Sequence, residues 1–212
     1  MGSWALRGAV RTSELVLALA SVPPFPHPER RLEQIATSPE AAAELLLAAD
    51  RWDPLAGRSV VDLGAGTGRL AIGAALLGAD PVVGVEIDAD AARVARRAAR
   101  AIGARIEMTV RDVTGYDRPA DVVLLNPPFG AQRRHADRPF WDTAFALARS
   151  WVHGFALADS RTFIAQRAVA RGAHIIETRP VAWDLERTFP HHTRNRVTIP
   201  VDRWAIRTHA PP

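Results

Sequence analysis

The sequence predicts an α/β protein with a seven-stranded, mostly parallel sheet and helices on both of its faces. Short runs rich in β-branched residues alternate with helical segments, which is the pattern of βα units. The first run leads into a glycine-rich loop at residues 64–68 that opens a helix, as in Rossmann-like nucleotide folds. Because 212 residues supply one substantial core, we expect one compact unit over residues 51–212 behind a helical extension over residues 1–50.

The composition is that of a globular protein, with 48% apolar and 24% charged residues. All 27 basic residues are arginines, and the net charge is +4 with a pI of about 10.9. The planar arginine side chain suits phosphate and base recognition, which favours a nucleic-acid partner. A compositional bias towards arginine explains the same count nearly as well, so charge alone does not decide between them.

The absence of cysteine excludes disulfides and thiolate metal sites, and it is consistent with a reducing, cytoplasmic location. No run of 18 apolar residues occurs, so no membrane span is predicted. The apolar run at residues 15–20 imitates a signal peptide. Glu14 and the shortness of that run favour instead an amphipathic helix capped by Thr12 or Ser13.

Two further segments precede the first expected strand. Residues 23–28 are rich in proline and should lie extended across the body of the protein. Thr37 or Ser38, with Pro39 at the first helical position, then begins a helix that reaches about residue 49. We expect this helix to cover one face or edge of the sheet.

Residues 58–63 form the first expected strand, and the next helix runs over about residues 69–77. The glycines between them let backbone N–H groups approach a ligand at a helix N-terminus, although G-x-G-x-G does not match the dinucleotide fingerprint. The second strand, residues 81–87, ends near Glu86, where a carboxylate can accept both hydroxyls of a ribose. The alternative is that Glu86 only begins the following helix.

The helix expected at residues 89–102 carries arginines at helical spacing, which we assign to a solvated face. The third strand, residues 106–110, is followed by Asp112 and Val113 at the rim where Gly66 and Glu86 are expected. Asp112 either accepts a hydrogen bond from an adenine amino group or forms a turn before Gly115.

The fourth strand, residues 121–125, is stopped by Asn126-Pro127-Pro128-Phe129, because neither proline can donate to a sheet. Asn126 therefore lies at the carboxyl end of a strand, where ligands bind in open α/β sheets. An amide, a rigid turn and an aromatic ring suit a flat group that bears an amine. The alternative is an Asn-Pro turn followed by a core phenylalanine.

A polar loop with three arginines comes next, ahead of a helix over residues 139–150 and a strand over residues 151–157. Asp159 or Ser160 is expected to cap a helix that reaches residue 170. The last two strands are expected at residues 173–178 and 197–206, and Pro200 implies a bulge or an edge position. Between them His191 and His192 lack a third ligand nearby, so we assign them to RNA or to a polar loop and not to a metal.

In this order, the motifs resemble those of a class I S-adenosylmethionine-dependent methyltransferase that methylates an amine. The residues that carry the resemblance are Asp62, Gly64, Gly66, Gly68, Glu86, Asp112 and Asn126-Pro127-Pro128-Phe129. The segment Leu32-Glu33-Gln34-x-x-Thr37, together with Gly130 after the asparagine motif, more narrowly resembles the methyltransferase-like protein 5 family of small-subunit ribosomal RNA adenine methylases. The similarity runs from about residue 11 to residue 206.

The resemblance implies a Rossmann-like class I methyltransferase fold, S-adenosyl-L-methionine as cofactor and the N6 amine of an adenosine in RNA as acceptor. Eukaryotic relatives need a small zinc-ribbon activator protein, and the sequence leaves open whether this chain needs one as well. The implied cofactor contacts are Gln34, Thr37, Asp62, Gly64, Gly66, Glu86, Ile87, Asp112, Val113 and Asn126. The implied catalytic residues are Asn126, Pro127, Pro128 and Phe129. We assign RNA contacts to Arg133, Arg134, Arg138, His192, Arg194 and Arg196.

Three rival functions stay open on the sequence alone. A protein-glutamine methyltransferase uses a similar Asn-Pro-Pro motif, usually followed by tyrosine where this chain has Phe129. A DNA adenine methyltransferase is disfavoured because no separate target-recognition domain is evident. Outside the enzymes, an RNA-binding ribosome-assembly factor is disfavoured by the presence of Asn126 and Glu86.

Overall fold

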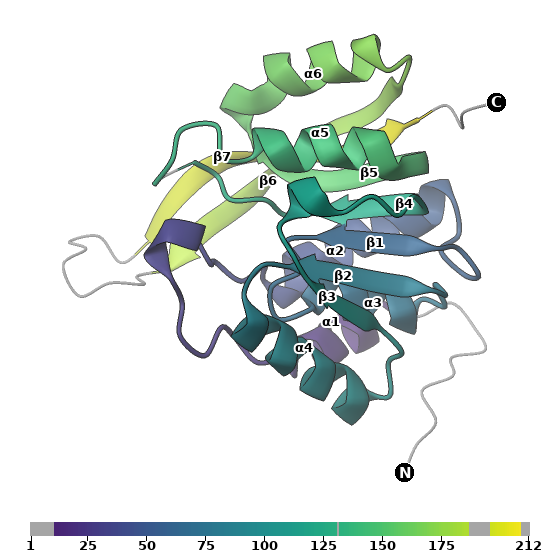
Figure 1. Ribbon diagram of the computed structural model, residues 1–212, viewed down its shortest axis with the longest axis vertical. Coiled ribbons are helices and arrows are strands. Elements are labelled where there is room, and N and C mark those ends of the chain that lie inside the picture. Colours follow the sequence, from purple (N-terminus) through teal and green to yellow (C-terminus); the bar gives the residue numbers. More distant parts are fainter. Residues whose placement is uncertain (1–10, 131, 187–195, 209–212) are drawn as a thin grey trace.

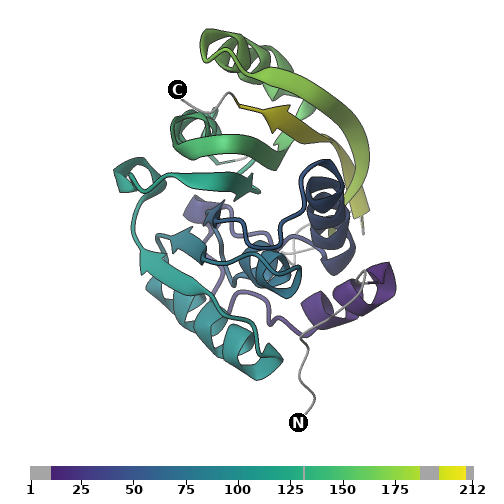
Figure 2. The same cartoon turned by 90° about the vertical axis from the view of Figure 1, so that its right-hand side faces the viewer.

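The computed structural model describes the backbone of residues 11–130, 132–186 and 196–208, and all of their side chains except those of residues 184–186, 196 and 197. A seven-stranded sheet in the order β3-β2-β1-β4-β5-β7-β6 forms the centre. Helices flank both of its faces (Figure 1, Figure 2). The predicted fold class is therefore confirmed.

The first five strands are parallel to their neighbours, so their carboxyl ends meet at one rim of the sheet. Strand β7 runs antiparallel to both β5 and β6. The strands are β1 (Val60–Leu63), β2 (Val82–Glu86), β3 (Glu107–Val110), β4 (Ala120–Leu125), β5 (Ala148–Leu157), β6 (His174–Glu186) and β7 (Arg196–Arg207).

The helices alternate with the parallel strands, as the βα pattern predicts. They are α1 (Thr12–Ala20), α2 (Pro39–Trp52), α3 (Arg69–Leu76), α4 (Ala89–Ile102), α5 (Arg138–Leu147) and α6 (Arg161–Ala170). Three short 3-10 turns join them: η1 (Arg30–Leu32), η2 (Val113–Gly115) and η3 (Ala158–Ser160).

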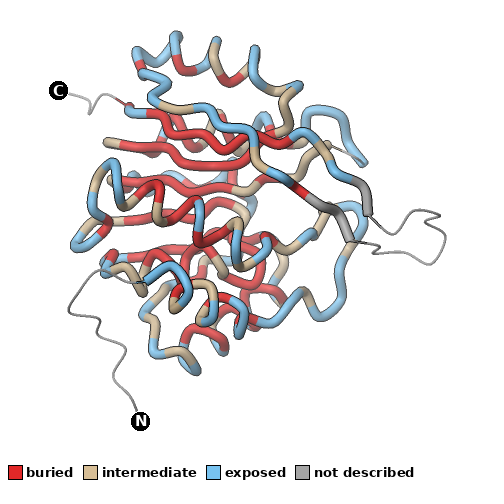
Figure 3. The backbone as a smooth tube through the Cα atoms, turned by 180° about the vertical axis from the view of Figure 1, so that it is seen from behind, coloured by how far each residue is buried: buried red, intermediate tan, exposed pale blue. Residues whose placement is uncertain are grey.

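The central strands are buried on both faces, as Figure 3 shows. Alternate residues of a strand point to opposite faces, so Val60 and Leu124 join the core of α1, α2 and α3. Val61 and Val123 join the core of α5 and α6 on the other face. Helices α1 and α2 of the extension thus belong to the same core as the sheet.

One of the predicted helix caps is confirmed and two are wrong. The Ser38 hydroxyl accepts a hydrogen bond from the Ala41 N–H at 3.1 Å, and α2 continues three residues past the predicted end. Thr12 is already the first residue of α1, and Arg11 at the N-cap position makes no side-chain hydrogen bond to the helix. Ser160 precedes α6, but its hydroxyl donates to Asp137 at 2.6 Å and does not cap the helix.

The last strands differ from the prediction in length and detail. Strand β5 begins three residues earlier than predicted, so α5 ends at Leu147. Strand β6 extends to Glu186 because it pairs with β7 along its length. The last β5 residue pairs with Val201, so Pro200 has only β6 beside it, in agreement with the predicted edge position. The bulge lies instead in β6, between Ile175 and Glu177.

The arginines of α4 mostly follow the prediction, since Arg93, Arg97 and Arg100 are exposed. Arg96 differs: it is half-buried and donates to the Met108 carbonyl at 2.6 Å. Among the helices that the structure describes, none has the length and apolar character needed to cross a membrane.

Candidate active site

A cavity of about 660 Å³ lies at the carboxyl rim of the parallel strands. It is bounded by the residues that follow β1 to β4 and by part of the N-terminal extension, and its volume lies in the range of cofactor sites. The predicted site residues that line it are Gln34, Thr37, Asp62, Gly64, Gly66, Glu86, Ile87, Asp112, Val113, Asn126, Pro128, Arg133, Arg134 and Arg138. Residues more than 100 positions apart in the sequence thus lie around one cavity.

The glycine loop after β1 forms one wall of this cavity. Gly64 and Gly66 have φ angles of +73° and +55°, in the left-handed region that favours glycine. A Cβ atom on them would lie 2.8 Å from the Phe140 ring and 2.7 Å from the Phe25 ring, respectively. Two aromatic rings therefore lie directly against the loop, which has no room for a side chain at either position.

Glu86 ends β2 and is only 6% exposed. One carboxylate oxygen accepts from the Gly66 N–H at 2.7 Å, and the other accepts from the Asp88 N–H at 2.9 Å. Burial raises the pKa of Glu86. The carboxylate therefore fixes the glycine loop, and it retains lone pairs for a ligand because each of its oxygens can accept two hydrogen bonds.

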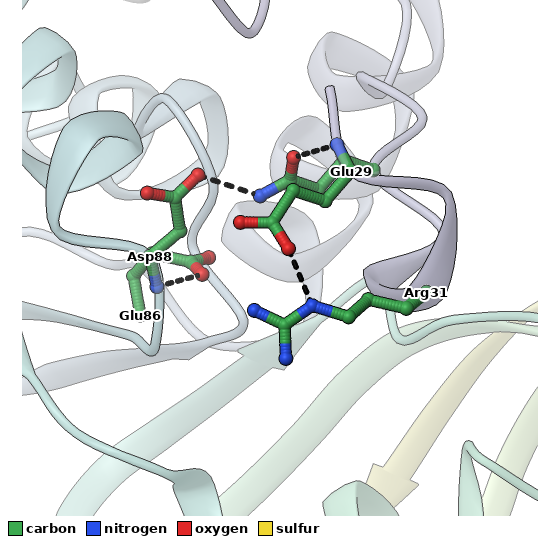
Figure 4. A network of polar contacts seen from close by, with 5 residues as sticks. Glu29, Arg31, Glu86 and Asp88 are labelled. Carbon is green, nitrogen blue, oxygen red and sulfur yellow. Dashed lines mark hydrogen bonds and ion pairs between the residues drawn. The ribbon is translucent and has the colours of Figure 1, made fainter. Parts of the chain in front are cut away.

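Gln34 connects the N-terminal extension to the start of α4. Figure 4 shows Glu29 and Asp88, which lie on the two sides of this connection. The Gln34 Nε2 donates to the Asp88 carboxylate at 2.7 Å, and its Oε1 accepts from the Glu29 N–H at 2.8 Å. Asp88 also caps α4 through the Asp90 N–H at 2.8 Å. Gln34 lines the cavity, and these bonds anchor the segment of residues 31–37 that lines the cavity with it.

Asp62, on β1, is 1% exposed. Its Oδ2 accepts from the Ala71 N–H at 3.0 Å in the first turn of α3, while Oδ1 has no hydrogen-bond partner among the described residues. Burial raises the pKa of Asp62 from its ordinary value of 3.8 to about 7. The carboxyl group is therefore neutral in weakly acidic solution.

We expect Asp62→Asn to stabilise the ligand-free protein at pH 8, and to stabilise it by a smaller amount at pH 5, because pH 5 lies between the ordinary pKa of 3.8 and the raised pKa of about 7. A raised folded pKa stabilises the fold below the unfolded value, and this contribution is lost as the pH rises through about 7. At pH 8 the free energies of unfolding of the variant and the parent should differ by no more than about 4 kcal/mol, at about 1.4 kcal/mol per pKa unit. Urea unfolding at both pH values measures this difference, and an equal difference at pH 5 and pH 8 would contradict the assignment.

Asn126 follows β4 at the rim and is half-buried. Its Nδ2 donates to the Thr37 hydroxyl at 2.7 Å. Its Oδ1 is buried and has no hydrogen-bond partner within the described part of the chain. The amide thus presents an unpaired acceptor in a cavity wall.

Of the other residues of the asparagine motif, Pro128 lines the cavity, whereas Pro127 and Phe129 do not. Pro127 is buried and is not among the lining residues. The half-buried Phe129 ring meets Trp183 edge-to-face, with ring centres 5.5 Å apart and planes at 78°, and Trp183 in turn meets Phe155 at 4.9 Å. Phe129 is not a lining residue either, so its stacking on a target base stays a prediction.

Asp112 forms the turn that the sequence offered as one of two alternatives. Its Oδ1 accepts from the Thr114 N–H at 2.8 Å and from the Thr114 hydroxyl at 2.7 Å, so it caps η2. These hydrogen bonds lower the pKa of Asp112. Because Asp112 also lines the cavity, a contact to a bound adenine stays a prediction.

The basic residues assigned to RNA divide into two groups. Arg133, Arg134 and Arg138 are exposed and line the cavity, and the Arg138 guanidinium lies 4.8 Å from the centre of the Phe163 ring. His191, His192, Arg194 and the side chain of Arg196 lie outside the described residues.

Sequence reasoning missed Arg69, which opens α3 directly after the glycine loop. Its guanidinium donates to the carbonyls of Leu19 at 3.1 Å, of Val22 at 2.8 Å and of Thr37. Burial lowers the pKa of Arg69. The signal was present, because a cation at a helix N-terminus opposes the helix dipole and requires a compensating role.

The comparisons with known proteins agree with this geometry. The family model described as "Methyltransferase small domain" matches residues 36–151. The chain is 32% identical over 200 residues to rRNA N(6)-adenosine-methyltransferase METTL5 of Danio rerio, covering 91% of this chain and 97% of that protein. It is also 32% identical over 206 residues to an uncharacterized protein of Methanocaldococcus jannaschii, covering 91% of this chain and 92% of the relative.

Among solved structures, a candidate RNA methyltransferase from Pyrococcus horikoshii has a TM-score of 0.84 and 34% identity, covering 95% of this chain and 98% of that one. The similarity therefore extends over the N-terminal extension, the glycine loop and the asparagine motif together. The chain belongs to the methyltransferase small domain family and, within it, to the group that includes METTL5.

Proposed function

We propose that this chain transfers the methyl group of S-adenosyl-L-methionine to the exocyclic N6 amine of an adenosine in RNA, specifically in small-subunit ribosomal RNA. The observation that carries the proposal is the unpaired Asn126 Oδ1 in the wall of a cavity that also holds the glycine loop and Glu86. The name of the Danio rerio relative, an rRNA N(6)-adenosine-methyltransferase, supports the substrate class.

The cavity residues fit S-adenosylmethionine. Gly64 and Gly66 place no side chain between the backbone and a ligand, which suits the methionine portion. Glu86 has lone pairs left for ribose hydroxyls, and Asp62 offers an unpaired oxygen for a cationic amino group. When bound, the cofactor supplies a methyl group activated by attachment to a sulfonium centre.

The amine of adenine is a weak nucleophile because its lone pair is delocalised into the ring. Asn126 Oδ1 and the Pro127 carbonyl are proposed to accept its two protons, which makes the nitrogen more pyramidal and directs its lone pair at the methyl group. The nitrogen would bond to the methyl carbon as the sulfur–methyl bond breaks, which leaves S-adenosylhomocysteine, and it would then lose one proton to solvent. With both protons accepted in this way, no strong general base is required. Alignment of the reacting atoms contributes up to about 7–11 kcal/mol in favourable cases.

Phe129 is proposed to stack on the target base, an interaction of roughly 1–3 kcal/mol per base. The edge-to-face contact with Trp183 fixes the orientation of the half-buried ring before RNA binds. The target adenosine must be unpaired or flipped out of a helix, since the amine is inaccessible inside a duplex.

We also propose a cytoplasmic location and a small zinc-ribbon protein as activator. The cysteine-free sequence is consistent with that location. Strand β3 lies at an edge of the sheet and exposes Val110, so it offers a strand edge to which a partner protein can add.

The function is tested by incubating the purified protein with small-subunit ribosomal RNA and methyl-labelled cofactor, with and without a zinc-ribbon activator. Mass spectrometry of the nucleosides should find the label on N6-methyladenosine. Parallel reactions with DNA and with protein extract test the two rival methyltransferase functions. Label on protein glutamine or on DNA adenine, with none in RNA, would overturn the proposal.

We expect replacement of Arg133 and Arg134 by alanine to weaken RNA binding about equally for all sequences. If each arginine contacts one phosphate of a single strand, the slope of log affinity against log salt should fall by about 0.7 per arginine. Filter binding over a salt series measures this slope. The control replaces Arg97 and Arg100, which are exposed on α4 and do not line the cavity, and equal losses in both variants would contradict the prediction.

A further inference from the structure

We propose that the segment from Glu33 to Thr37 positions the methyl acceptor, in addition to covering the cofactor. Thr37 orients the amide of Asn126, and Glu33 holds the backbone that follows the asparagine motif. This inference rests on the proposed function, because it assigns positioning residues for the same reaction.

The Thr37 contact joins residues that are 89 positions apart in the sequence. Thr37 is 8% exposed, and its hydroxyl lies 2.7 Å from Asn126 Nδ2. Its own carbonyl is held by the guanidinium of Arg69. The backbone that carries the hydroxyl is therefore fixed from α3.

The orientation of the Asn126 amide decides what it can do. An asparagine side chain has a donating end and an accepting end of nearly the same shape, and only the oxygen can accept a proton from an amine. With Nδ2 paired to Thr37, Oδ1 is left as the unpaired end. Without the hydroxyl the amide can turn, which would direct a donor at the acceptor's amine.

Glu33 acts on the other end of the same loop. Its carboxylate accepts from the backbone N–H groups of Gly130 at 2.8 Å, of Gln132 at 2.7 Å and of Arg133 at 3.4 Å. Glu33 itself has a φ angle of +49°, which costs a residue other than glycine free energy. Three hydrogen bonds to an ionised group offset that cost and fix the loop that carries the arginines.

The two contacts hold both ends of the loop from Asn126 to Arg133 against one short segment. That segment is itself anchored to α4 through Gln34 and to α3 through Arg69. A cover that served the cofactor alone would need neither the Thr37 contact to Asn126 nor the Glu33 contact to Gly130. The geometry therefore assigns Glu33 and Thr37 to the acceptor side of the site.

The test compares Thr37→Val, which removes the hydroxyl at nearly constant shape, with Thr37→Ser, which retains it. In the full chain we expect Thr37→Val to slow single-turnover methyl transfer at saturating cofactor about tenfold, equivalent to about 1.4 kcal/mol, with cofactor Kd within about twofold of the parent by calorimetry. Thr37→Ser should restore most of the rate. Weaker cofactor binding with an unchanged rate would overturn the inference and return Thr37 to the cofactor.

A second readout does not depend on the reaction. In ¹⁵N-labelled protein, the Asn126 side-chain amide resonances, identified by their loss in Asn126→Ala, should exchange slowly with water in the parent and in Thr37→Ser, and quickly in Thr37→Val. Identical exchange in all three would overturn the inference even if no RNA is methylated. Failure of the proposed function would appear separately, as a parent protein that does not methylate RNA.

For Glu33 the test is Glu33→Gln, which removes the charge from the carboxylate that holds three backbone N–H groups. We expect a lower single-turnover rate and a higher KM for RNA, with the cofactor Kd unchanged. Glu40→Gln is the matched control, since it makes the same change at an exposed position at the start of α2. Equal rates for the two variants would remove Glu33 from the proposal.

Discussion

Asn126→Ala is expected to abolish detectable methyl transfer while leaving the affinity for S-adenosylmethionine nearly intact. The variant removes the oxygen proposed to accept a proton from the amine, an interaction made most strongly in the transition state. Loss of one such group from a preorganised site typically costs roughly 10²–10³-fold in kcat. Single-turnover assays with labelled cofactor measure the loss, and calorimetry measures the binding.

The matched control for Asn126→Ala is Asn126→Asp, which retains an oxygen acceptor but adds a charge beside Thr37. It should retain more activity than the alanine variant if the accepting oxygen matters most. An alanine variant with turnover close to that of the parent would refute the mechanism. Loss of cofactor binding in the alanine variant would instead indicate that Asn126 belongs to the cofactor site.

Glu86→Ala is expected to weaken cofactor binding strongly. Two charge-assisted ribose hydrogen bonds, at ~1.5–3 kcal/mol each, correspond to a loss of roughly 10²–10⁴-fold in affinity. The variant also frees the N–H groups of Gly66 and Asp88, which Glu86 holds at 2.7 and 2.9 Å. Calorimetric titration with S-adenosylmethionine measures the change.

Glu86→Gln separates the two contributions to that loss. It preserves one oxygen acceptor and the size of the side chain, so the glycine loop should be disturbed less than in Glu86→Ala. We expect an intermediate affinity for Glu86→Gln. An affinity equal to that of the parent in both variants would remove Glu86 from the cofactor site.

The sequence predicts the strands well because they depend on local pattern. A buried apolar run, a glycine loop and a helix follow one another within about 30 residues in a βα unit, and parallel strands place their carboxyl ends at one rim. This is why Gly66, Glu86 and Asn126 could be predicted to lie together, and they line one cavity.

The contacts of the N-terminal extension could not be predicted in the same way. Residues 29–37 have no long periodic element, and their partners lie far away in the sequence: Gly130 for Glu33 and Asp88 for Gln34. Which backbone group a side chain reaches depends on loop geometry that no periodicity encodes. The cap of α6 failed for a related reason, because the Ser160 hydroxyl has another partner nearby in Asp137. The cap of α1 failed because the helix already begins at Thr12, which leaves Arg11 at the cap position.

The packing of the Phe129 ring could not be predicted from the sequence either. A strand-end motif identifies an aromatic ring near the rim, but its packing depends on Trp183, which comes from the antiparallel pair of β6 and β7. Sequence patterns do not state which distant aromatic residue will meet it.

The segment from Glu33 to Thr37 lines the cofactor cavity and also contacts the loop that follows Asn126, and this double attachment has a kinetic consequence. The bonds from Glu33 and Thr37 to the acceptor loop connect the same segment that closes over the cofactor cavity. With the cofactor bound under that segment, as proposed, spent cofactor should leave after the methylated RNA is released. We therefore expect an ordered cycle in which the cofactor enters first and S-adenosylhomocysteine leaves last, so that this product competes with the cofactor and not with RNA.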